Sequence, residues 1–207
     1  MAFPDSTSLW LFSLAALALL VIPGPAVLYV VVQSAENGRR VGLASVAGIH
    51  LGTLVHVTAA AAGLSALIVA SAFAFSAVKY AGAAYLVYLG VRRLLGRDAA
   101  LTVDRGRESL RRAFARGAVV NVLNPKTALF FLAFLPQFVD ADRGAVWSQA
   151  LVLGLVFVGL GFVSDSLYAL AAGSAANLLR RRRGLMRYGS GFVYIGLGAT
   201  AALVKRA

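Results

Sequence analysis

The sequence of 207 residues contains no cysteine and few groups that bind metals. Disulfides, thiolate catalysis, thiolate zinc sites and iron–sulfur clusters all need cysteine, so these are excluded. Two histidines and eight carboxylates are a poor basis for a metal site, and we expect no cofactor. Only 14% of the residues are charged, against about 25% in soluble domains. Since 60% are hydrophobic and the mean hydropathy is +0.80, the composition indicates an integral membrane protein.

Long apolar segments occupy nearly the whole chain and predict an all-α fold. A transmembrane helix needs about 20 apolar residues, and these runs are continuous, without the alternation of β-barrel strands. The first segment is expected to stay in the protein, because its start carries Asp5 and lacks the basic residues of a signal peptide. The six predicted segments form a single transmembrane domain over 1–207 and lie at 8–33, 41–70, 73–95, 117–139, 146–177 and 186–204.

The two halves of the chain resemble each other. Leu86 to Val91 matches Phe192 to Leu197, and Pro25 and Pro125 hold comparable places in the first and fourth segments. Each half has three segments, an odd number, so the halves must cross the membrane in opposite senses, as in inverted-repeat transporters. We therefore predict two inverted three-helix repeats, with repeat one at about 8–95, a basic cytoplasmic loop at about 96–116 and repeat two at about 117–204.

The net charge of +12 is concentrated between the apolar segments. Eight arginines lie between Arg92 and Arg116, and five between Arg180 and Arg187. This placement favours membrane orientation over a nucleic-acid partner. The first, third and fifth loops carry fifteen basic residues and the other side carries four, so the positive-inside rule places those loops in the cytoplasm and both termini in the periplasm.

Prolines inside the first and fourth segments predict broken helices. Pro23-Gly24-Pro25 removes two backbone donors, which leaves either a kink or a break that lines a cavity. Asn is a favoured N-cap and Pro a favoured first helical residue, so Gly24-Pro25 and Asn124-Pro125 predict helices that restart within the membrane. The segments run antiparallel, so the restarted ends should meet near its middle. Their unpaired N–H groups would form a pocket for a carboxylate, with Asn121 nearby.

Ionisable side chains inside the membrane mark candidate functional residues. Lys126 either extends to the interface or belongs to the site. Asp165 lies too deep to reach water, so it must pair, take up a proton or face a cavity, and Tyr168 shares its helix face. A structural Asp165–Lys126 pair is the alternative to contact with a substrate amine or with protons.

The two histidines both lie in the second segment. Gly48, Gly52 and His56 step by four along one helix face, which predicts close packing against another helix. His56 is therefore either hydrogen-bonded in that interface or in contact with substrate. His50 has the weaker case of the two.

These residues resemble the LysE/RhtB family of amino-acid exporters over nearly the whole chain. The resemblance implies proton-driven export of amino acids or related small metabolites across the bacterial inner membrane. A second segment with few polar groups favours a neutral substrate. The motifs that carry the resemblance are Pro23-Gly24-Pro25, Lys79 to Leu86 with Gly90, Asn121 to Lys126, Leu135 to Phe138, and Asp165.

The predicted function is therefore a transporter and not an enzyme, with protons, lipids and a small amino acid as partners and a homodimer permitted by the glycine-rich faces. Asp165 would couple export to protons. The alternatives are a membrane enzyme that acts on a lipid through Lys126, Asp165 and His56, and an assembly factor or scaffold. The residues predicted to bind substrate are Pro23, Gly24, Pro25, His56, Asn121, Asn124, Pro125, Lys126, Asp165 and Tyr168.

The charge distribution gives a prediction of topology. Reporter fusions after Leu101 should report the cytoplasm and fusions at Ala207 the periplasm, because the basic loops stay inside. A cytoplasmic C-terminus with a periplasmic N-terminus would make the number of spans odd, which contradicts the inverted repeat.

Overall fold

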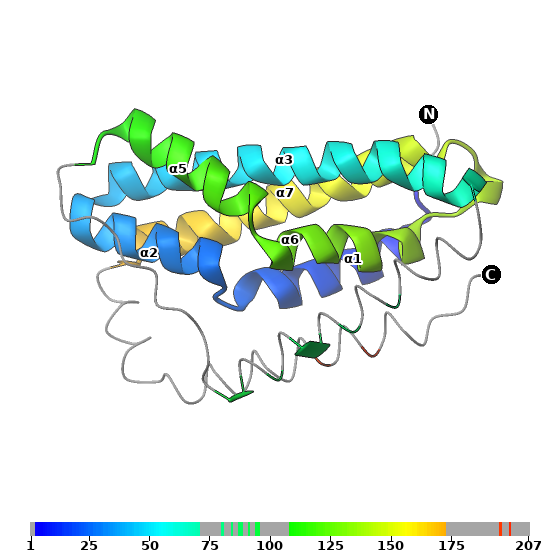
Figure 1. Ribbon diagram of the computed structural model, residues 1–207, viewed down its shortest axis with the longest axis horizontal. Coiled ribbons are helices and arrows are strands. Elements are labelled where there is room, and N and C mark those ends of the chain that lie inside the picture. The colour runs from blue at the N-terminus through cyan, green and yellow to red at the C-terminus, as the bar shows by residue number, and fades with distance from the viewer. Residues whose placement is uncertain are drawn as a thin grey trace.

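The structure, a computed structural model, describes residues 3–70 and 108–172 and isolated positions at 80, 84, 87, 88, 91, 94, 95, 195 and 199. The described residues form six α-helices and include no β-strand, which confirms the all-α prediction (Figure 1). The predicted segments 73–95 and 186–204, apart from those positions, and the end of 146–177 lie outside the described residues. Six spans in two inverted repeats therefore stay a prediction.

The first predicted segment is a broken pair of helices. Helix α1 (Ser6–Val21) and helix α2 (Pro25–Asn37) meet at an angle of 51°. Pro25 stands in the first turn of α2 and Gly24 is its N-cap, so the predicted break and restart are confirmed. Asp5 caps α1 by accepting from the Ser8 N–H (2.8 Å), and its hydrogen bonds with Ser8 hold the pKa of the Asp5 carboxyl below its ordinary value.

The fourth predicted segment is broken in the same way. Helix α5 (Leu110–Val122) is followed by α6 (Pro125–Leu129), a π-helical turn (Phe130–Phe134) and a 3₁₀ turn (Leu135–Phe138), with a bend of 46° between α5 and the rest. The Asn124 side chain accepts from the Lys126 N–H (3.1 Å), which confirms it as an N-cap.

Helix α5 begins at Leu110, inside the stretch predicted as a loop. The Ser109 side chain caps its first turn, and several exposed arginines follow. Hydropathy marks where a chain can contact lipid, whereas a cap and a helix-forming sequence decide where the helix starts. The helix therefore extends beyond the apolar segment.

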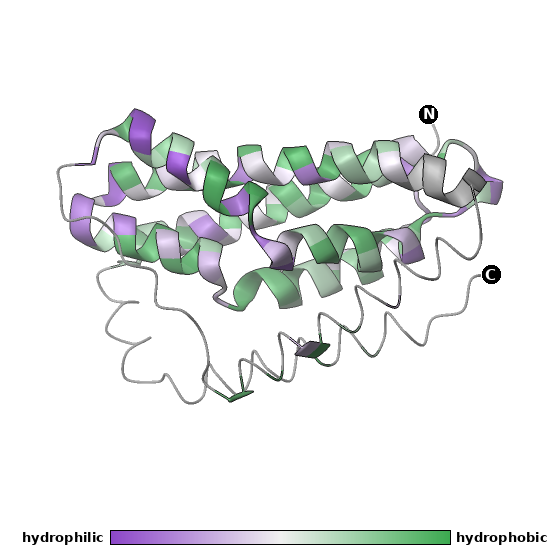
Figure 2. Cartoon of the chain, viewed as in Figure 1, coloured by the Kyte–Doolittle hydropathy of each residue, from purple (hydrophilic) through white to green (hydrophobic). Residues whose placement is uncertain are grey.

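Two further helices are straight and long enough to cross a membrane. Helix α3 (Arg39–Ala70) holds a candidate span at Arg39–Gly63, and α7 (Val146–Leu170) holds another, each of 25 residues. With each bent pair taken as one span, the described residues provide up to four candidate spans. Figure 2 shows mostly hydrophobic residues along the helices, with hydrophilic residues gathered at the left end of the bundle, in the loop before α7 and at the break between α5 and α6.

Small residues bring α3 and α5 into close contact. A Cβ on Gly52 would lie 2.7 Å from the Ala118 carbonyl oxygen, and one on Gly117 would lie 2.6 Å from the Ser45 carbonyl oxygen. A Cβ on Gly48 would overlap the Phe114 carbonyl. Real Cβ atoms do not approach so closely, so this face accepts only glycine. The predicted close packing through Gly48 and Gly52 is therefore confirmed.

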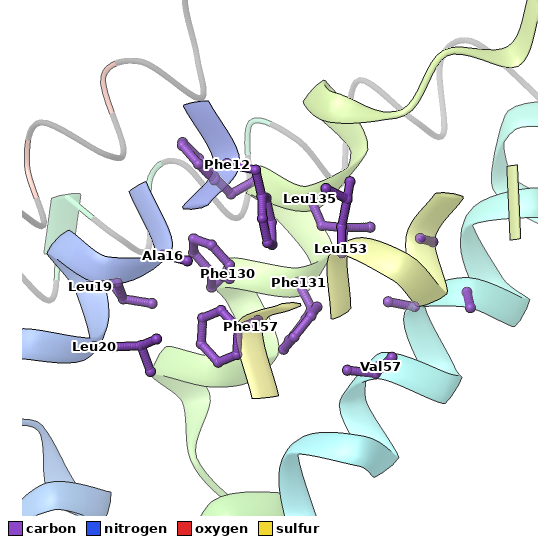
Figure 3. Packing of buried hydrophobic residues seen from close by; sticks show 14 residues of the cluster. Phe12, Ala16, Leu19, Leu20, Val57, Phe130, Phe131, Leu135, Leu153 and Phe157 are labelled. Atoms are coloured by element: carbon purple, nitrogen blue, oxygen red, sulfur yellow. The ribbon is translucent and has the colours of Figure 1, made fainter. Parts of the chain in front are cut away.

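An aromatic cluster joins α1, the π-helical turn and α7 (Figure 3). The Phe130 and Phe131 rings each lie 5.0 Å from the Phe157 ring, and Phe12 lies 5.7 Å from Phe130, measured between centroids. Such pairs contribute roughly 0.5–1.5 kcal/mol each beyond the burial of their area. The cluster fixes α1 against the residues that follow the second break, so the two breaks lie side by side near the middle of the bundle (Figure 1).

Candidate functional site

The two helix breaks border a small buried cavity. Its volume is about 30 Å³, and its walls come from α1, α2, α3, α5, α6 and α7. One water needs about 10–15 Å³ by this measure, so the cavity holds about two waters and an amino acid does not fit without helix movement. The polar side chains among the described lining residues are His50, Thr53, Asn121, Asn124, Lys126, Thr127 and Asp165.

Two carbonyl groups near the end of α1 lack their usual helical donor, although that of Leu19 accepts a long bond from the Ile22 N–H (3.3 Å). In a continuous helix the Leu19 carbonyl would bind the N–H of residue 23 and the Val21 carbonyl that of residue 25, but both residues are proline. The Lys126 Nζ donates to the Leu19 carbonyl (2.8 Å) and to that of Ile22 (2.9 Å). The Tyr168 hydroxyl donates to the Val21 carbonyl (2.7 Å).

Lys126 and Tyr168 therefore replace the donors that the two prolines remove. An unsatisfied carbonyl in the membrane interior costs several kcal/mol, so these hydrogen bonds stabilise the break. The charge of Lys126 also lies at the negative end of the α1 dipole. Lys126 as a whole residue is 9% exposed, so it stays in the interior and does not extend to the surface.

Asn121 is the centre of a hydrogen-bonded network between α3 and α5. Its Nδ2 donates to the Ile49 carbonyl (3.0 Å) and to Thr53 Oγ1 (2.8 Å). Its Oδ1 accepts from Asn124 Nδ2 (3.1 Å) and from Thr127 Oγ1 (3.1 Å). All four bonds available to this amide are made, so Asn121 holds the second break in place.

His56 belongs to the same interface. Its Nε2 donates to the Asn121 carbonyl oxygen (2.9 Å), which is the hydrogen-bonded interface position that the Gly48, Gly52 and His56 spacing predicted as one of two alternatives. His56 is not among the described residues that line the cavity.

The two restarted helices present different N-termini to the cavity. The Asn124 side chain already binds the Lys126 N–H at the start of α6. At the start of α2, Gly24 supplies no side-chain cap, and Ala26 and Val27 line the cavity. The first N–H groups of α2 are therefore better placed to bind an anion than those of α6.

His50 and Asp165 form a buried pair of ionisable side chains. The His50 Nε2 lies 3.1 Å from the Asp165 Oδ2, with 6% and 4% of the two side chains exposed. The contact lacks the alignment of a hydrogen bond, and among the described residues neither Asp165 Oδ1 nor His50 Nδ1 has a hydrogen-bond partner. Asp165 thus contacts His50, a residue to which the sequence pattern gave little weight.

A glycine on α7 makes room for this pair. Gly161 lies one turn before Asp165, and a Cβ there would lie 2.7 Å from His50 Cε1. The Phe162 ring lies beside the imidazole, with 5.6 Å between centroids. His50 and Asp165 lie at similar depths in their predicted segments. That similarity is the signal in the sequence that could have indicated that the two side chains meet.

The structure divides the predicted site residues into two groups. Five of them line the cavity: Gly24, Asn121, Asn124, Lys126 and Asp165. The other five lie at the breaks or at a helix interface around it: Pro23, Pro25, His56, Pro125 and Tyr168.

Comparisons with known proteins identify the family of the chain. The LysE type translocator family matches residues 17–204. The chain belongs to the LysE family. This confirms the resemblance drawn from the Pro23-Gly24-Pro25 and Asn121 to Lys126 motifs, and it makes this LysE family member a membrane translocator.

Three relatives cover nearly the whole chain. An uncharacterized membrane protein of Vibrio cholerae is 30% identical, over 95% of this chain and 97% of its own length. An uncharacterized membrane protein of Pseudomonas aeruginosa is 31% identical, over 95% and 97%. A homoserine/homoserine lactone efflux protein of Salmonella typhimurium is 30% identical, over 96% and 98%. No solved structure matches the chain significantly.

The space at Gly161 gives a prediction about stability. Gly161→Ala should lower the free energy of unfolding by about 1–3 kcal/mol, because the new methyl group overpacks the His50 ring. Gly159→Ala is the matched control on the same helix, since its Cβ would meet nothing within 4 Å. Thermal unfolding of both variants in detergent measures the difference, and equal melting temperatures would contradict the packing described here.

Proposed function

We propose that this LysE family member is a secondary transporter that exports neutral amino acids or related small metabolites across the bacterial inner membrane in exchange for protons. The observation that carries the proposal is the buried His50–Asp165 pair in a cavity at two helix breaks. Both termini are periplasmic in this proposal, as the basic loops require.

The His50–Asp165 pair is poorly suited to a purely structural role. A buried ion pair repays the cost of its desolvation only when its geometry is good and further hydrogen bonds satisfy both partners. Here the contact is misaligned, and one atom of each side chain lacks a partner among the described residues. Ionisable groups in such surroundings cluster at functional sites. By contrast, Lys126 and Asn121 make well-formed bonds and support the breaks.

An amino acid would lie between two features of the cavity. Its ammonium group would bind the Asp165 carboxylate, which also couples export to protons. Its carboxylate would bind the first N–H groups of α2, which Pro23, Gly24 and Pro25 expose by ending α1. Asn121, Asn124 and Pro125 would form the opposite wall. His56, Lys126 and Tyr168 would affect substrate binding indirectly, because their hydrogen bonds hold the helix ends that border the cavity.

Transport requires the cavity to open to each side in turn. At about 30 Å³ the cavity is too small for an amino acid, so binding and release both require the helices to move. Rocking of one three-helix half against the other would open it, as in other inverted-repeat transporters. The bonds of Lys126 and Tyr168 to α1 cross between the halves of the chain and would move with that rearrangement.

One of the three relatives supports this class of substrate. The Salmonella relative is named for efflux of homoserine and its lactone, and both compounds are small and carry an amino group. A lipid-modifying enzyme and an assembly factor are the rival functions. Membership of a translocator family supports neither.

Counterflow in liposomes tests the function. Purified protein should exchange radiolabelled L-homoserine, L-threonine or L-leucine against the same unlabelled compound, and should exchange L-lysine less well, because Asp165 is the single deep carboxylate among the described residues of the cavity. Exchange of none of these compounds would overturn the proposal.

The same assay assigns the role of Asp165. Asp165→Asn keeps the shape of the side chain but removes its charge, so uphill export driven by a pH gradient should fall to background. If Asp165 also binds the ammonium group, downhill counterflow should fall at least tenfold as well. Proton-driven export at the wild-type rate would exclude both roles. Insertion and size-exclusion behaviour like those of the wild type serve as the control for folding.

A proline variant tests the carboxylate site. In Pro25→Ala the new N–H can bind the Val21 carbonyl, so the helix can continue and the first N–H groups of α2 are withdrawn from the cavity. Affinity for L-homoserine should fall about 5- to 30-fold, the range of 1–2 kcal/mol for a charge at a helix N-terminus. L-homoserine lactone has no carboxylate and should lose much less. Equal losses for both compounds would contradict this site.

A further inference from the structure

The imidazole of His50 occupies the place at Asp165 that a substrate ammonium would take. The His50 Nε2 lies 3.1 Å from Asp165 Oδ2, at the distance of an ionic contact and inside the cavity proposed to hold the substrate. Both side chains are more than nine-tenths buried. A cation at this position would neutralise Asp165 without any substrate present.

We infer that His50 carries the proton that is exchanged for substrate, which rests on the proposed function. In the empty site the His50 imidazolium is the counterion of the Asp165 carboxylate. When an amino acid enters, its ammonium group takes over the carboxylate, and His50 loses a proton. Two cations that compete for one carboxylate are then bound alternately, which is the basic requirement of antiport.

The exchange balances in atoms and charge. The empty site holds one carboxylate and one imidazolium and is neutral. The loaded site holds the Asp165 carboxylate, a zwitterionic amino acid with no net charge and a neutral imidazole, so it carries one negative charge. The released proton carries the matching positive charge, and the substrate carboxylate lies at the positive N-terminal end of α2. The proton that leaves comes from His50 Nδ1, which has no hydrogen-bond partner among the described residues, and it passes to water in the cavity. No bond other than this N–H is broken.

The geometry around the ring fits this exchange. The contact of Nε2 with Asp165 is not an aligned hydrogen bond, so a better-placed ammonium can displace it. Gly161 lets the imidazole lie close against α7, and the Phe162 ring lies beside it, tilted by 51° with 5.6 Å between centroids.

Other charged or titratable groups around the pair are already engaged. Lys126 of α6 donates to the carbonyls of Leu19 and Ile22, and Tyr168 of α7 donates to that of Val21. His56 of α3 binds the Asn121 carbonyl. The residues that α1 and α2 contribute to the cavity, and Asn121 of α5, carry no titratable side chain. Among the described residues His50 is therefore the group placed to exchange a proton with Asp165.

Proton release on binding tests the inference without a membrane. Wild-type protein in weakly buffered detergent solution at about pH 6, within the usual titration range of imidazole, is mixed with L-homoserine, or with L-threonine or L-leucine if that compound gives the stronger counterflow. About one proton should be released per substrate bound. N-acetyl-L-homoserine lacks the ammonium group and should release none.

The variant His50→Gln separates this inference from its rival, in which Asp165 itself carries the proton. Proton release should fall at least tenfold in His50→Gln, and proton-driven export should be lost, while binding measured by calorimetry persists because Asp165 remains. Release at the wild-type level in His50→Gln would overturn the inference and leave the proposed function intact. If no compound binds to the wild type, the proposed function fails and this inference fails with it.

Nitrogen NMR of the wild type gives a second measurement that does not depend on the folding of a variant. The chain has two histidines, so ¹⁵N-histidine labelling gives two rings, and His56 is an internal reference. On saturation with L-homoserine, or the alternative probe above, the His50 signals should move from imidazolium to neutral values while those of His56 stay in place. Unchanged His50 signals with bound substrate would overturn the inference.

Discussion

The hydrogen bonds from Lys126 and Tyr168 to the end of α1 are the interactions on which the rest of the site depends. Pro23 and Pro25 leave the Leu19 and Val21 carbonyl groups without their usual helical donors in a region where water is scarce. Side chains from α6 and α7 supply those donors, so the break is stable only when the second half of the chain is packed against the first. The cavity and the free N-terminus of α2 follow from this packing.

Satisfied and unsatisfied polar groups have different places in the structure. Asn121 makes every hydrogen bond that its amide can make, and it holds α3, α5 and α6 together. Burying the ionisable side chains of His50 and Asp165 costs more free energy than burying a neutral amide, and these two side chains make fewer hydrogen bonds than Asn121 does. Among the described polar side chains that line the cavity, His50 and Asp165 are the two with atoms that lack a hydrogen-bond partner, which is why we assign substrate and proton exchange to them.

Glycines make these contacts possible at close range. Gly48, Gly52 and Gly117 let the backbones of α3 and α5 approach, which brings Asn121 to Ile49 and Thr53. On the other side of α3, Gly161 admits the His50 ring to α7. In a lipid environment helices gain little from the hydrophobic effect against each other, so such close packing and the hydrogen bonds it allows supply much of the association.

The sequence by itself determined the family, the membrane-helical class, the two breaks and the close-packed face of α3, because each depends on local chemistry: apolar length, the missing N–H of proline, the capping of Asn124 and glycine spacing. It also marked Asp165 as a deep carboxylate. Only the tertiary structure decided that His50 is the side chain in contact with Asp165 and that Lys126 and Tyr168 bind the end of α1. Those contacts join residues far apart in the chain, and they depend on how the helices are rotated against one another, which no local pattern specifies.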